Sequence, residues 1–252
     1  NEQFKNTFVA ENQNISTYQN NSKLKHFNIF QENTLRYNFS KKIDITANLN
    51  FQQSFFKFND FSTNIFLLNP SLFLNIKKTG FGNFSLSYSE NNTLPEVNQL
   101  TSNFQLTDYR NFSQGTTYNK PLKNQTTTLN YYIYNDEKRF SINTSVYYVN
   151  SKSIFNTSSN LTSDFNFNSY IQTKGSNSYN FNFSFVNYVR KLKLASKIET
   201  NNSWITSPIN VNSTEFLNAK SYSNSIKYSG TTYFKSKINF DFGFSYNYFQ
   251  SN

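Results

Sequence analysis

The sequence predicts an all-β fold, an antiparallel up-and-down transmembrane β-barrel, on three observations. Residues 238–248 alternate apolar and polar side chains without a break, which is the period of a strand with one apolar and one polar face. Aromatic residues reach 19% although the mean hydropathy is −0.67. The connections between the expected strands alternate between short and long. A membrane barrel with a wet interior combines all three features.

The segment 238–248 sets the expected strand length. At roughly 3.3 Å per residue it extends over about 36 Å, or about 27 Å vertically when tilted by about 40°. Soluble strands are usually about five or six residues long. The length therefore favours a strand that crosses a bilayer.

We expect ten strands, because the same alternation recurs along the chain. It is clear in residues 43–51, 84–89, 140–148, 179–185 and 238–248. It is weaker in residues 27–39, 66–76, 127–134, 192–204 and 222–234. Helical periodicity over three turns is not evident, and the apolar runs are too short for a transmembrane helix.

Short turns are expected at one pole of the barrel and long loops at the other. The short turns fall near Ser40–Lys42, Lys77–Gly82, Asn135–Arg139, Arg190–Lys191 and Lys235–Lys237. The long connections cover residues 52–64, 90–125, 150–178 and 203–221, and the chain opens with a polar stretch, 1–23. Bacterial outer-membrane barrels show this asymmetry, with the short turns in the periplasm.

The net charge of +10 raises the question of a nucleic-acid partner, which we do not expect. Each short turn carries a basic pair, so the charge gathers at one pole and is not interleaved with aromatic residues as in single-strand binders. Lys and Arg at hairpin tips keep the tips solvated and oppose edge-to-edge association. Contact with phospholipid head groups or a periplasmic partner is the functional alternative.

Catalytic chemistry is not expected. The chain has no Cys and one His, and the acids are scattered, with the closest pair, Asp136 and Glu137, in a basic turn. The sequence lacks a phosphate-binding glycine loop and a Gly-x-Ser-x-Gly elbow. We therefore expect neither an enzyme nor a metal site or cofactor.

A family resemblance rests on residues 69–125. The stretch Asn-Pro-Ser-Leu-Phe-Leu at 69–74 leads into Phe-Ser-Leu-Ser-Tyr-Ser at 84–89, then polar residues, Pro95 and the step Gln99-Leu100. This resembles the β-barrel of TonB-dependent receptor-like outer-membrane proteins of the Bacteroidetes type. The family's next loop carries Gly-Asn-Pro-x-Leu, and here Gly115 and Pro121-Leu122 match it loosely.

The resemblance implies a 22-stranded barrel in the bacterial outer membrane, closed by a plug domain and energised by a periplasmic coupling protein. Residues 1–252 are then one barrel domain, a C-terminal portion without the plug. The implied function is uptake of a nutrient such as a glycan, peptide or chelate. Outer-membrane lipid and a surface lipoprotein are the other partners that we consider.

Candidate ligand-binding residues lie at the long-loop pole. The 90–125 connection offers aromatic and polar groups able to hold a sugar or a peptide: Gln99, Asp108, Tyr109, Arg110 and Asn111. Trp204 lies near the same end of its strand. It is interpreted first as part of an interfacial aromatic girdle, with Tyr246 and Tyr248, and second as a residue that stacks on ligand.

Two other functions remain open. A structural or adhesive surface barrel would share the strand pattern but transport nothing. A secreted, soluble, β-rich carbohydrate-binding module would be soluble without detergent, which neither barrel would be.

Overall fold

The computed structural model describes residues 2–6, 9–10, 13–14, 20–58, 61–79, 82–100, 103–116, 120–212, 215–234 and 238–252. Most of them form strands, and α1 (Val97–Leu100) is one short turn of helix. Among them no helix is long and apolar enough to cross a bilayer.

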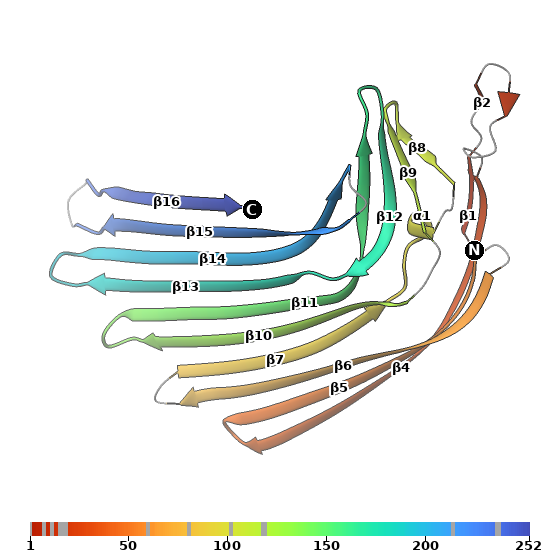
Figure 1. Cartoon of the computed structure of the whole chain (residues 1–252). Helices are drawn as coiled ribbons and strands as arrows, with labels where there is room; N and C mark the ends of the chain where they lie inside the picture. The colour runs from red at the N-terminus through yellow and green to blue at the C-terminus, as the bar shows by residue number, and fades with distance from the viewer. Residues whose placement is uncertain are drawn as a thin grey trace.

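Ten long strands follow one another in a single sheet, each antiparallel to the next (Figure 1). They are β4 (Asn20–Ser40), β5 (Ile43–Phe58), β6 (Phe61–Thr79), β7 (Gly82–Thr93), β10 (Leu122–Asn135), β11 (Phe140–Leu161), β13 (Asn177–Val189), β14 (Leu194–Val211), β15 (Leu217–Thr232) and β16 (Asp241–Ser251). Each contains or overlaps one predicted stretch, so the all-β antiparallel prediction is confirmed. The last strand begins three residues later than Ile238, although the Phe240 carbonyl still accepts from Thr232 N at 2.9 Å.

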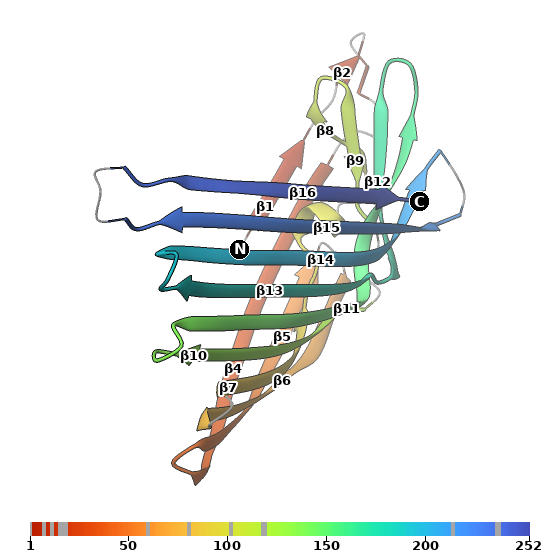
Figure 2. The ribbon, with the colours of Figure 1, turned by 90° about the vertical axis from the view of Figure 1, so that its left-hand side faces the viewer.

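The sheet is curved and does not close on itself (Figures 1 and 2). At one side β16 pairs only with β15, and at the other β4 pairs with β5 and with the short β1 (Glu2–Asn6). A separate small hairpin joins β2 (Val9–Ala10) to β3 (Gln13–Asn14). The closed barrel therefore stays a prediction.

The strand ends that the five short turns join all lie at the same end of the sheet, as predicted (Figure 1). Three of the turns close with a residue at positive φ: Gly82 (108°), Arg139 (51°) and Lys193 (48°). In the first turn the Ser40 hydroxyl accepts from the Lys42 and Ile43 amides, both at 3.2 Å. The basic pair of the fifth turn, at 235 and 237, lies outside the described residues.

The long connections are mostly strand rather than loop, contrary to the prediction. Only residues 59–60 separate β5 from β6, and β11 continues to Leu161 before β12 (Asn166–Lys174) turns back along it. The prediction ended each strand where its alternation weakened. Backbone pairing needs no apolar face, so the hairpins extend beyond that point.

A lobe stands upright from the main sheet at the end away from the short turns (Figure 1). It comprises β8 (Gln105–Asp108), β9 (Asn111–Gln114), β12 and the distal half of β11. β9 pairs in parallel with β12, and the end of β11 pairs in parallel with Asn210 and Val211 of β14. A small aromatic cluster fills the lobe: Phe104, Phe112, Phe165 and Phe167.

The main sheet has almost no hydrophobic core. Within the described part of the chain only Leu67, Leu100 and Phe112 are buried apolar residues, whereas forty large apolar side chains are exposed. Domains in water bury an apolar face against a second layer. This sheet is a single layer, so both of its faces are open.

Candidate functional site

Cross-strand register gathers the apolar side chains on one side of the sheet, which we name the apolar face. It carries Phe242, Phe244 and Tyr246 of β16, which are 48%, 63% and 56% exposed. A representative row across six strands joins Ile45, Leu74, Leu86, Leu129, Val146 and Phe181. Each strand's alternation is thus in phase with that of its neighbours, and an apolar surface extends over these six strands.

An aromatic row borders the apolar face toward the lobe. Tyr88, Tyr148, Tyr179, Trp204 and Tyr222 fall on one line of register partners, with Thr127 between the first two. The rings of Tyr148 and Tyr179 stack at 4.7 Å, and those of Trp204 and Tyr222 lie 5.2 Å apart. Amphipathic rings of this kind concentrate where hydrocarbon meets water.

A polar row comes directly after the aromatic row. Its members are the register partners Glu90, Gln125, Asn150, Asn177, Thr206 and Lys220. Two residues further along each strand, the side chains on this face therefore change from aromatic to hydrogen-bonding. This abrupt change is typical of the boundary between an apolar medium and water.

Glu90 is held ionised in this polar row. It forms an ion pair with Lys123 and accepts hydrogen bonds from Gln125 Nε2 at 2.8 Å and Asn92 Nδ2 at 3.3 Å. Burial raises its pKa, but the hydrogen bonds from Lys123, Gln125 and Asn92 and the Lys123 charge outweigh burial and lower the pKa to about 2. The carboxylate therefore links β7 to β10 beyond the aromatic row.

The opposite side, the polar face, repeats short neutral side chains. One line of register partners crosses all ten long strands: Asn38, Asp44, Asn75, Ser85, Asn130, Ser145, Asn182, Asn201, Ser225 and Asn247. Asn130 Nδ2 donates to Ser85 Oγ at 3.3 Å, and Asn182 Nδ2 donates to Ser145 Oγ at 3.2 Å. We name this line the Asn/Ser row.

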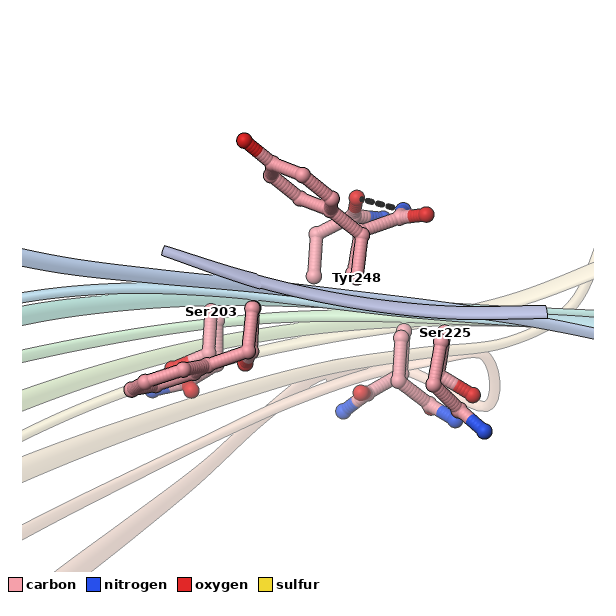
Figure 3. A pocket seen from close by; sticks show the side chains of 11 residues that line it. Ser203, Ser225 and Tyr248 are labelled. Carbon is pink, nitrogen blue, oxygen red and sulfur yellow. Dashed lines mark hydrogen bonds between the residues drawn. The ribbon is translucent and has the colours of Figure 1, made fainter. Parts of the chain in front are cut away.

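A shallow depression of about 310 Å³ lies over β13 to β16 and includes part of the Asn/Ser row. Its eleven lining residues are all uncharged. Ser203 and Ser225 lie on one side of the sheet and Tyr248 on the other (Figure 3). Carboxamides and hydroxyls both donate and accept hydrogen bonds, so this wall is suited to water and to neutral polar solutes.

Charged groups on the polar face are paired where the structure gives their contacts. Lys77 Nζ lies 2.8 Å from Asp44 Oδ1, and Lys197 Nζ lies 2.7 Å from Glu199 Oε1. No group of three or more His, Cys, Asp or Glu that would suit a metal occurs in the described ranges. At these two places the charges on the polar face therefore offset each other.

Gln99, one of the sequence candidates, lies half-buried in α1 and shapes its own loop. Its Oε1 accepts from Glu96 N at 3.0 Å, and its carbonyl accepts from Thr116 N at 2.8 Å. Both contacts hold the segment between β7 and β9 together.

Asp108, Tyr109, Arg110 and Asn111 form the tight turn between β8 and β9. Asp108 accepts from Arg110 N at 3.0 Å and from Asn111 Nδ2 at 2.5 Å, and these hydrogen bonds lower its pKa. Asn111 Oδ1 accepts from Asn166 Nδ2 at 2.9 Å, which fixes the turn to β12. Arg110 lies over the ring of Tyr109 at 5.2 Å, and the ring is 79% exposed. The turn is thus rigid, with Tyr109 and Arg110 presented outward.

Trp204 lies elsewhere, in the aromatic row between Tyr179 and Tyr222. A row of this kind is what the girdle interpretation predicts, although Tyr248 and Tyr246, predicted at the same level, lie one and two register steps nearer the short turns. The six candidates therefore occupy three places: the α1 loop, the β8–β9 turn and the aromatic row. The sequence did not reveal the Asn/Ser row, although Asn or Ser at the polar position of neighbouring strands would have signalled it once the strands were aligned on their turns.

Comparison with known proteins identifies no family. No protein-family model matches the chain, and no curated protein is significantly similar to it.

Proposed function

We propose that the chain is part of an outer-membrane β-barrel of the TonB-dependent receptor-like type that takes up a nutrient through a plugged lumen. One observation carries the proposal: ten long antiparallel strands form a single layer with one apolar and one polar face. The apolar face would contact lipid, and the polar face would line the lumen and face the plug.

The exposed apolar surface argues against a soluble module. Soluble monomers rarely expose contiguous apolar patches above a few hundred Å², and the apolar face of this sheet exposes large side chains on strand after strand, among them Leu72, Tyr179 and Phe244. A bilayer covers such a face, and long antiparallel strands with short turns at one end suit an outer-membrane barrel.

The polar face favours transport over a purely structural role. It carries carboxamides and hydroxyls over ten strands, together with the ion pairs Lys77–Asp44 and Lys197–Glu199. Such a wall can stay hydrated and let polar solutes pass. Nutrient would bind first at the lobe, with Tyr109 and Arg110 presented outward, then cross when a periplasmic coupling protein displaces the plug.

Two measurements test the proposal on the full-length protein. Resistance of membrane fractions to urea extraction, with heat-modifiable electrophoretic mobility, is expected of a barrel. Detergent-free solubility of the refolded protein would instead establish the soluble module.

For transport, a deletion strain should lose growth on one nutrient from a panel of glycans, peptides and iron chelates. Unchanged growth on every nutrient, with altered envelope integrity, would indicate the structural barrel.

A further inference from the structure

A polar cluster interrupts the apolar face between β14 and β15. Asn224 Nδ2 donates to Asn202 Oδ1 at 2.5 Å, and Asn202 Nδ2 donates to Thr200 Oγ1 at 3.2 Å. The Tyr222 hydroxyl also donates to Asn202 Oδ1, at 3.3 Å. Along the same row, β5 to β13 carry only aliphatic or aromatic residues.

Large apolar side chains surround this cluster. Phe181 is the register partner of Asn202, and Tyr248 is the register partner of Asn224. Trp204 and Ile226 follow on the same face of β14 and β15, and they are 45% and 39% exposed. The arrangement is a polar centre with an apolar rim, the reverse of an interface between proteins in water. In lipid, where apolar side chains are already covered, side chains that hydrogen-bond across the contact favour association instead.

The carboxamides keep hydrogen-bonding capacity that the sheet does not use. A carboxamide has two N–H donors and an oxygen with two lone pairs. In the described residues, Asn224 Oδ1 and one N–H of each carboxamide have no protein partner. Hydrocarbon cannot supply one, and each unsatisfied group in lipid costs several kcal/mol.

We propose that this patch docks against the same patch of a second copy, forming a two-fold symmetric pair within the membrane. The proposal rests on the membrane location given above. A carboxamide is self-complementary, because its N–H and its oxygen can pair with the oxygen and N–H of an identical group. Two-fold interfaces bring identical patches together, so Asn224 of each copy completes the other's hydrogen bonds inside the apolar rim.

Single-cysteine crosslinking of the full-length protein in native outer membranes tests the pairing. This chain contains no Cys, so each introduced thiol is unique within residues 1–252. Ile226→Cys places a thiol beside the cluster and keeps both carboxamides. Thr144→Cys is the matched control, because Thr144, Phe183, Thr200 and Ile226 form one register row and Thr144 lies three strands away. A short bis-maleimide should give dimer at 226 and at least tenfold less at 144.

The outcomes separate this proposal from the membrane proposal. A protein that is integrated in the membrane but gives no dimer at 226, or equal dimer at 226 and 144, overturns the pairing alone. A protein that is not integrated overturns the membrane location and the pairing together. As a second variant, N202L/N224L should remain integrated and lose the dimer seen by crosslinking at 226. Retention of that dimer would overturn the role of the carboxamides.

Discussion

The two faces of the sheet are built from alternate residues of the same strands, yet they differ in variety. The apolar face mixes Ile, Leu, Val, Phe, Tyr and Trp, whereas the Asn/Ser row consists almost wholly of two residue types. Any side chain of low polarity can contact an apolar medium, so many residue types suit that face. Short neutral side chains that pair across strands serve the other face. The difference is the one expected if, as proposed, the two faces meet different media.

The largest expected effect comes from one charge placed on either face. Val146→Lys puts an ammonium between Leu129 and Phe181, and should cost about 2–4 kcal/mol if that face contacts hydrocarbon. Ser145→Lys, one residue earlier between Asn130 and Asn182, is the matched control and should cost below about 1 kcal/mol because water solvates it. Unfolding by guanidinium chloride in lipid vesicles measures both. Equal losses of unfolding free energy in the two variants would show that the two faces do not differ in their surroundings.

The aromatic row should show coupling between its members. The rings of Trp204 and Tyr222 lie 5.2 Å apart, and a double-mutant cycle with alanine should give about 0.5–1.5 kcal/mol of interaction free energy. The pair Trp204 and Tyr148 is the control, because Tyr179 separates them in the row, and its coupling should stay below about 0.5 kcal/mol. Similar interaction free energies in both cycles would indicate that the substitutions act through a rearrangement of the sheet rather than through direct contact between the rings.

The free energy of unfolding, measured as a function of pH, tests the role of Glu90 in the polar row. The pKa of Glu90 falls from 4.5 to about 2 on folding. The contribution of this carboxylate to the free energy of unfolding is therefore complete above pH 4.5 and is lost as the pH falls toward 2. Because solvent screens this boundary, we expect a loss of about 1 kcal/mol. Glu90→Gln should abolish that loss, and Lys123→Gln should move it to higher pH. An unchanged titration in Glu90→Gln would assign the loss to other carboxylates.

The smallest effect is expected on the Asn/Ser row. Asn182→Ala removes the 3.2 Å hydrogen bond to Ser145, and water can replace it, so the free energy of unfolding should change by about 0.5 kcal/mol or less. Guanidinium unfolding of the same vesicle-bound protein checks this. A loss as large as that of Val146→Lys would show a packed polar face rather than a wet one.

The strands were predictable because a period of two is a local property. The clear alternation of 43–51 and 179–185 located β5 and β13. Pairing of Asn166–Ser169 with Asn111–Gln114 was not predictable, because it joins segments far apart in the sequence and carries no local periodicity. The aromatic row and the Asn/Ser row depend on register between strands, which alternation within one strand does not specify.

The order of the strands determines how the gain or loss of a hairpin would change the width of the sheet. Each long strand bonds to the long strands before and after it, and within the described residues the one further pairing between long strands joins the end of β11 to β14. A whole hairpin can therefore be duplicated or deleted while every other strand keeps its partner, apart from the two at the junction. Sheet width is open to change in steps of two strands. The lobe is the exception, because its parallel pairings tie distant segments together and would not survive such a step.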